Sequence, residues 1–265
     1  MFDLSESTRG ILIPVASTLL ATGILSLLSW LTLETRFNKK LRTAWQHLEM
    51  AEALQKEGQF SDAKDELIKT IALLSDEERS FLLSQAYMRL GDVSMLLRDW
   101  DAAIRSFILC GEIGKHVRHG TSEDVILLRL GKAYFASGKF EDAFRCFDEA
   151  RRIEEKHPNH PLLGETFNRL GEIEAKRQHP EAAINYYSRA VNFHVKIGDK
   201  RSVAAAHFCL GDLNLKIANL SEAQAHLLRA RDEYSELGDF PLLAILENKL
   251  AQARKRGKAA QSNRD

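Results

Sequence analysis

The chain repeats one short pattern at an interval of forty residues. A Leu-Gly pair recurs at this interval, and an alanine follows each glycine after twelve residues, with a large side chain four positions later. The pairs are Leu90-Gly91, Leu130-Gly131, Leu170-Gly171 and Leu210-Gly211, the alanines include Ala103, Ala143, Ala183 and Ala223, and the large residues include Phe107, Phe147, Tyr187 and Leu227. Self-similarity at a period of 20–50 residues is typical of solenoids, in which each unit buries its apolar face against the next.

Each unit has the pattern of two helices joined by a tight turn. Leu127, Leu130, Gly131 and Tyr134 have the i, i+3, i+4, i+7 spacing of one helical face, and Gly138 marks the turn that follows. A glycine at position 131 allows a second helix to approach closely, and we expect Ala143 to face it. Only 15 glycines and 5 prolines occur in 265 residues, which favours helix throughout.

We therefore predict an all-α fold: a right-handed α-solenoid of five helix pairs and a C-terminal capping helix, preceded by one transmembrane helix. The solenoid is expected over residues 43–256 and is followed by a disordered tail, 257–265. Its repeats are expected near 43–75, 76–119, 120–158, 159–198 and 199–238, with the capping helix at 239–256.

The spacing of the Leu-Gly, Ala and large-residue positions resembles the tetratricopeptide repeat (TPR). The unit is longer than the usual 34 residues and lacks the proline that often ends it. Long units with Gly-Asp before the next helix, as at Gly198-Asp199 and Gly238-Asp239, are similar to those of kinesin light chain and the spindle-orientation protein Pins. This resemblance implies a superhelix that binds a protein or peptide partner along its concave side.

An uncharged segment precedes the repeats. From Gly10 to Leu33 there is no charged residue, and about 20 apolar residues suffice to cross a bilayer. After a short tail, 1–10, we predict a membrane anchor at 11–33, from Ile11 to Leu33, with Trp30 at headgroup depth. A cleaved signal peptide and a buried core helix are the alternatives.

The flanks of this segment predict its orientation. Basic residues gather in the juxtamembrane segment 34–42, whereas Arg9 is the one basic residue before the anchor. By the positive-inside rule the N-terminus lies outside and the repeats face the cytoplasm of a single-pass membrane protein. Between Gly23 and Gly58 there is neither Gly nor Pro, which predicts one helix running from the bilayer into the first repeat, with a break at Phe37-Asn38 as the alternative.

The predicted groove contains a basic row beside apolar side chains. Arg89 and Arg169 each have an acidic residue three positions later, whereas Arg129 is followed by Lys132, so the middle repeat is expected to present two cations together. We predict a site for a carboxylate or phosphate on a peptide whose apolar side chains contact the same groove. The predicted site residues are Arg89, Arg129, Lys132, Arg169, Met88, Met95, Phe135 and Phe208. The alternative is a structural ladder in which Lys132 pairs with Asp92 and Glu172.

The sequence lacks familiar catalytic and metal-binding motifs. It has no phosphate-binding glycine loop and no zinc-protease or hydrolase motif, so we predict no enzyme, no cofactor and no metal. His116-x-x-His119 and His157-x-x-His160 are interpreted as polar turn residues, since no acidic or cysteine partner is evident beside them. Three cysteines without a CxxC motif favour a reducing compartment, and 37 basic against 37 acidic residues argue against nucleic-acid binding.

The predicted function is that of a membrane-anchored scaffold or receptor, which binds a protein partner and recruits it to the membrane for assembly or targeting. The alternative is a non-catalytic subunit of a membrane enzyme complex, or one whose active site has no familiar motif. The identity of the partner, the membrane and the oligomeric state stay open.

Overall fold

The computed structural model describes residues 39–75, 81–117, 121–157 and 159–262. A first helix over residues 39–56 is followed by ten more. These are α2 (Phe60–Leu74), α3 (Phe81–Leu96), α4 (Trp100–Gly114), α5 (Glu123–Ala136), α6 (Phe140–Glu154), α7 (Leu163–Lys176), α8 (Pro180–Ile197), α9 (Lys200–Lys216), α10 (Leu220–Glu236) and α11 (Phe240–Ser262). The predicted all-α helical solenoid is confirmed.

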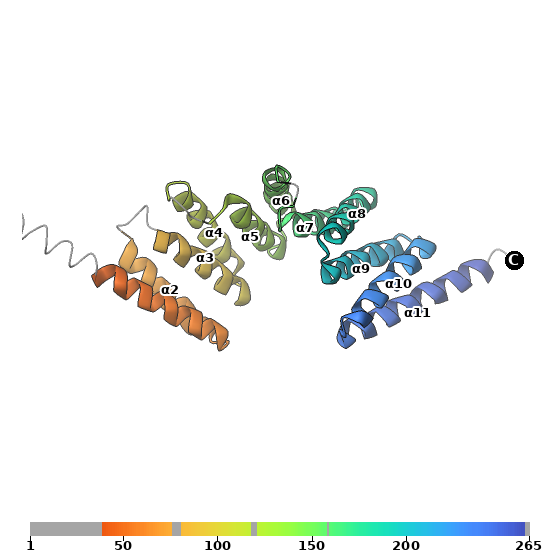
Figure 1. Cartoon of the computed structure of the whole chain (residues 1–265), viewed down its shortest axis with the longest axis horizontal. Coiled ribbons are helices and arrows are strands. Elements are labelled where there is room, and N and C mark those ends of the chain that lie inside the picture. The colour runs from red at the N-terminus through yellow and green to blue at the C-terminus, as the bar shows by residue number, and fades with distance from the viewer. Residues whose placement is uncertain (1–38, 76–80, 118–120, 158, 263–265) are drawn as a thin grey trace, which may run out of the picture.

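The helices are arranged as consecutive pairs along an arch (Figure 1). Among α2 to α11, each helix packs chiefly on its neighbours in the chain, and α9 also touches α11. Figure 1 shows α3, α5 and α9 nearer the inside of the arch, with α4, α6 and α8 nearer the outside. The first helices of the pairs therefore provide the inner surface, as expected for a solenoid of helix pairs.

The Leu-Gly position lets the two helices of a pair come into close contact. A Cβ atom built on Gly131 would lie 2.6 Å from the Phe147 ring, and one on Gly171 would lie 2.8 Å from Tyr187. The expectation that Ala143 faces Gly131 is thus incomplete: Ala143 is buried, but the large ring four residues later fills the space left by the glycine. The recurrence of glycine and a large residue at one period follows from this contact.

The turn inside each pair places one residue in the left-handed region. Its φ angle is +79° at Gly58 and Gly138, but also +60° at Arg98, +64° at Gln178 and +62° at Ala218. These five positions are forty residues apart. Glycine adopts this conformation without steric cost, whereas the other three side chains raise the free energy of the folded state. The turn geometry is therefore repeated even where the sequence lacks glycine.

The C-terminal helix is longer than predicted. Helix α11 continues to Ser262, so the expected disordered tail from residue 257 is wrong for residues 257–262. Leu246, Leu250 and Ala253 are fully buried against α10 and the end of α9. The Arg256 guanidinium also donates a hydrogen bond to the Leu215 carbonyl at 3.1 Å. The Lys, Ala and Gln residues that follow favour helix. Helix α11 therefore extends beyond its last buried residue.

The predicted membrane anchor lies outside the described residues. This applies to Ile11, Trp30 and Leu33, to the N-terminal tail and to the proposed helix before residue 39. Among the residues that the structure does describe, no helix combines the length and apolar character needed to cross a bilayer.

Candidate functional site

A hollow of about 420 Å³ lies between the first helices of the first three pairs. We call it the groove pocket. It is lined by Gln55, Asp92, Met95, Leu96, Phe107, Arg129 and Lys132. Three of the predicted site residues, Met95, Arg129 and Lys132, are thus brought together. Gln55, Asp92 and Leu96 lie on the same inner surface, and the Phe107 ring reaches the pocket from α4 past Gly91.

Helical spacing positions the charged and apolar sides of this pocket. Asp92 and Met95 are three residues apart near the end of α3, so their side chains lie on one face. Arg129 and Lys132 have the same relation on α5. Parallel packing of successive repeats places these two faces opposite each other across the pocket.

Both pocket cations have acidic partners. Arg129 forms an ion pair with Asp92 of the preceding repeat, and Lys132 lies 2.7 Å from Glu165 at the start of α7. The two cations expected together in the middle repeat are therefore each ion-paired across repeats, and Lys132 pairs with Glu165 in place of the Asp92 and Glu172 of the alternative ladder. Stacking brings each cation closer to a neighbouring repeat than to the acidic residues of its own helix.

The Arg129–Asp92 contact belongs to a series of pairs between residues 37 positions apart. Arg89 lies 2.8 Å from Glu52, and Lys249 pairs with Asp212. In both pairs the two residues are 37 positions apart in the sequence. The expected pairing of Arg89 with Asp92 is thus replaced by one with the preceding repeat. Because 37 positions are one repeat less about one helical turn, the two side chains of each pair lie next to each other on adjacent repeats.

This series is interrupted in the middle of the solenoid. At the same offset Arg169 would meet the like-charged Lys132, and Glu172 would meet Cys209. Arg169 instead pairs within its own helix, with Glu172 at 3.0 Å as predicted and with Glu165 at 3.5 Å. Lys132 and Arg169 therefore share the Glu165 carboxylate.

The pKa values of these carboxyls show how differently they are solvated. Burial raises the pKa of Asp92, even though the adjacent Arg129 favours its ionised form. Burial also acts to raise the pKa of Glu165, but Lys132 and Arg169 outweigh it and the pKa is lowered. Asp92 is consequently the carboxylate whose charge is the more costly to keep in the groove.

The remaining predicted apolar site residues are buried in the core or partly buried against it. Met88 is buried beside Phe107 and Ile126. Phe135 makes an edge-to-face contact with Phe140, with ring centroids 5.3 Å apart, and Phe208 packs with α10 and α11. These three side chains stabilise the repeats that carry the groove and do not line the pocket.

Comparisons with known proteins agree with this architecture. Residues 123–194, which include α5, α6, α7 and most of α8, match the family model described as tetratricopeptide repeat. The chain has a TPR-type fold. A search of curated proteins gives no sequence match.

Solved structures, two of them described as containing tetratricopeptide or TPR-like repeats, resemble most of this chain at low sequence identity. TPR-like repeats of a putative kinesin light chain from Podosopora anserina are 20% identical with a TM-score of 0.64, covering 76% of this chain and 98% of that one. The apo form of RapI is 16% identical, with a TM-score of 0.57 and coverages of 82% and 85%. A signal-transduction ATPase with a TPR sensor from Pyrococcus horikoshii is 16% identical, with a TM-score of 0.68, covering 83% of this chain and 36% of that one. At these identities the likeness shows the fold alone.

The groove pocket combines accessible charge with accessible apolar surface. The Arg129 side chain is 44% exposed, and Leu96 at the rim is 51% exposed. Of the three charged residues that line the pocket, two are cationic. The pocket therefore presents both cationic and apolar side chains on the inner surface.

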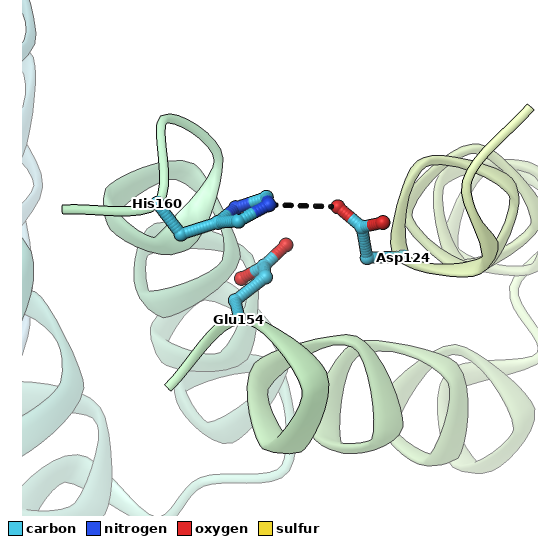
Figure 2. A group of neighbouring side chains, drawn as sticks. All are labelled: Asp124, Glu154 and His160. Carbon is cyan, nitrogen blue, oxygen red and sulfur yellow. Dashed lines mark ion pairs between the residues drawn. The ribbon is translucent and has the colours of Figure 1, made fainter. Parts of the chain in front are cut away.

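A second cluster was missed by the sequence analysis. His160 was interpreted as a turn residue without acidic neighbours, but Figure 2 shows it beside Asp124 and Glu154. Asp124 lies in the first turn of α5, whose N-cap residue Ser122 makes no side-chain cap bond. Stacking turns Asp124 inward, and the separation of 36 positions between Asp124 and His160 conceals the contact in the sequence.

Proposed function

We propose that this chain is a membrane-anchored TPR scaffold without catalytic activity of its own. Its groove pocket binds a protein or peptide that carries an acidic group and apolar side chains, and its N-terminal segment holds that partner at the membrane for assembly or targeting. The observation that carries the proposal is the convergence of Met95, Leu96, Arg129 and Lys132 on one accessible hollow of the inner surface.

Recognition in this pocket rests on exchange of ion-pair partners. A carboxylate or phosphate of the ligand replaces Asp92 on the exposed Arg129 guanidinium, where bidentate hydrogen bonds are available. The raised pKa of Asp92 favours this exchange, because its charged form is poorly solvated. Lys132 supplies a second cation, while Met95 and Leu96 contact the apolar part of the ligand.

The membrane part of the proposal depends on sequence alone. Residues 11–33 have the length and apolar composition of a single span, and the basic residues of 34–42 place the solenoid in the cytoplasm. Helix is present from residue 39 onward, which supports a short connection between the span and the first repeat.

Binding is tested with synthetic peptides and the full chain in detergent micelles. An array of Leu- and Phe-containing peptides carries Glu, phosphoserine, Gln or Lys at one central position. We expect the Glu and phosphoserine peptides to bind, and the double variant Arg129→Gln, Lys132→Gln to lose this preference.

The control for these peptides removes two cations from a different surface. Arg145→Gln with Arg152→Gln changes two exposed, ion-paired arginines of α6 and should leave binding intact. Equal binding of the Gln and Lys peptides, or equal loss in both double variants, would refute the groove assignment.

Anchoring is tested by alkaline extraction of membranes from cells that express the full chain. The full chain should stay in the membrane pellet, whereas a variant lacking residues 1–33 should be released. A C-terminal tag should be protected from external protease in intact cells, and an N-terminal tag should be cleaved. Release of the full chain by alkali would exclude the anchor.

A further inference from the structure

Three potential metal ligands converge where the third helix pair meets the fourth. Asp124 lies in the first turn of α5, Glu154 is the last residue of α6, and His160 lies in the turn before α7. Figure 2 shows their side chains directed toward one another. One ligand atom from each lies within 4.8 Å of one from each of the others.

The two carboxylates are buried with oxygen atoms that have no hydrogen-bond partner. Asp124 is 3% exposed and Glu154 is fully buried. Oδ2 of Asp124 and Oε2 of Glu154 each lack a hydrogen-bond partner, although Oδ2 lies 3.4 Å from Nε2 of His160. An unsatisfied buried carboxylate oxygen is costly, so these two atoms are available to a positively charged ligand.

The surroundings of Glu154 add to its negative charge. The charged groups that act most strongly on it are Asp124, Glu165 and Glu155, and all three are acidic. Its position at the C-terminal end of α6 also places it at the negative end of the helix dipole. A cation held by Glu154 and Asp124 would compensate all of these interactions.

The donor set specifies the kind of cation. Two carboxylates and one imidazole suit a borderline transition metal, whereas Ca²⁺ and Mg²⁺ prefer oxygen ligands alone. A tetrahedral ion with bonds of about 2.0–2.1 Å holds its ligand atoms about 3.4 Å apart. The separation of Nε2 of His160 from Oδ2 of Asp124 has this value, so a small closing movement of Glu154 completes the set.

We propose that Asp124, Glu154 and His160 bind a divalent transition-metal ion of the zinc class. The ion takes one oxygen from each carboxylate and Nε2 from the imidazole, and water completes its coordination. It ties the start of α5, the end of α6 and the segment leading into α7 to one point. Its role is structural: it fixes the angle between the third and fourth helix pairs.

A neighbouring hydroxyl orients one of these ligands, and a second contact must change. The Thr166 hydroxyl donates a hydrogen bond to Oε1 of Glu154 at 3.0 Å, which leaves Oε2 for the ion. The Leu162 N–H approaches Nδ1 of His160 at 3.4 Å, a long contact. Because an imidazole that binds metal through Nε2 carries its proton on Nδ1, this contact must open when the ion binds.

The test uses the full chain in detergent micelles, stripped with a chelator and dialysed. Titration with ZnCl₂ followed by calorimetry should give one ion per chain, and Co²⁺ should produce the intense visible absorption of a four-coordinate site. Asp124→Asn, Glu154→Gln and His160→Gln should each weaken Zn²⁺ binding at least about 100-fold. Thr166→Val should weaken it about 10-fold by releasing the Glu154 carboxylate.

Matched variants separate this site from other histidines. His157→Gln changes an exposed ring in the same turn, and His226→Gln removes one ring of the stacked His207–His226 pair; both should retain full affinity. Asn and Gln keep the shapes of Asp124 and Glu154, and His160 is partly exposed, so thermal unfolding without metal should show that the variants fold. Only the wild-type melting temperature and those of the two controls should rise fully with Zn²⁺.

Three results would overturn the proposal. They are the absence of stoichiometric Zn²⁺ binding by the stripped chain, loss of binding in His226→Gln or His157→Gln in place of the three ligand variants, and a preference for Mg²⁺ or Ca²⁺ over Zn²⁺. Because the peptide array reports on the groove pocket, failure of the metal test leaves the proposed function unaffected.

Discussion

Gly131 of α5 lies directly against the ring of Phe147 in α6, and a Cβ atom at this glycine would lie 2.6 Å from Cε1 of the ring. Phe147 is fully buried, so the ring has no free space into which it can move. The relation recurs between Gly171 and Tyr187. The closeness of the two helices in a pair therefore depends on a hydrogen atom in place of a side chain.

We expect Gly131→Ala to destabilise the solenoid. Overpacking against the buried ring costs about 1–3 kcal/mol, which exceeds the roughly 1 kcal/mol that alanine gains over glycine in a helix. Gly114→Ala is the control, because its nearest neighbour is Ile126 Cδ1 at an ordinary 3.8 Å. Urea unfolding should show a lower midpoint for Gly131→Ala and no loss for Gly114→Ala. Equal midpoints would contradict the packing argument.

At the turn residues in the left-handed region, glycine should increase stability where another residue now stands. Replacing Ala218 with glycine should stabilise the chain by about 0.5–1 kcal/mol, because glycine adopts a φ of +62° without steric cost. Gly138→Ala should destabilise by about 1 kcal/mol for the same reason.

A helical position next to such a turn is the control. Ala136→Gly lies at the end of α5 and should destabilise by about 1 kcal/mol. The three variants are compared by thermal unfolding. If Ala218→Gly and Ala136→Gly change the melting temperature in the same direction, the conformational argument is wrong.

The capping role of α11 predicts a contrast between adjacent residues. Leu246 is fully buried against α10, whereas Ile245 is 48% exposed. Leu246→Ala should destabilise by about 2–5 kcal/mol through the cavity it leaves, and Ile245→Ala should have little effect. Denaturant unfolding measures both. Similar losses would mean that α11 is not held by this face.

Glu154 should make the stability of the metal-free chain depend on pH. Burial, with the charges of Asp124 and Glu165, raises its pKa from 4.5 to about 7, although Thr166 acts in the opposite direction. The folded chain therefore holds this proton more tightly than the unfolded chain. The resulting stabilisation is complete below pH 4.5 and is lost as the pH rises through about 7.

The measurement compares unfolding free energies in chelator between pH 5 and 8. The wild type should lose on the order of 2–3 kcal/mol over this range from Glu154 alone. Glu154→Gln should remove that component and be the more stable protein at pH 8. Glu123→Gln, an exposed change in the first turn of α5, should follow the wild type. An unchanged pH profile in Glu154→Gln would show that the carboxyl is not protonated in the fold.

The repeating fold was predictable because one short contact set is used again and again. Leu-Gly, alanine and a large residue report the same packing in each repeat, so four copies reinforce one inference. The groove was predicted less well. Arg129, Lys132 and Met95 line the pocket, but Met88 is buried in the core and Phe135 is partly buried against it, because the rotation of each helix decides which side chains face the groove.

The partners of charged groups were not predictable from spacing within a helix. Arg129 has Lys132 three residues later, yet its partner is Asp92 in the preceding repeat. Likewise no spacing within a helix relates Asp124 to His160, and only the stacking of α5, α6 and α7 brings them together. Contacts between repeats depend on the superhelical rotation, which the period alone does not contain.

Packing between chain neighbours gives the described arch an elastic character. Since α2 to α11 touch chiefly the helices next to them in the chain, with α9 and α11 as an added contact, bending at one joint places little load on distant ones. Small rotations add along the array, so the curvature of the inner surface can follow the shape of a ligand at low energy per joint. An ion bound between α5, α6 and α7 would make that joint rigid, so that the helix pairs on either side of it would bend independently.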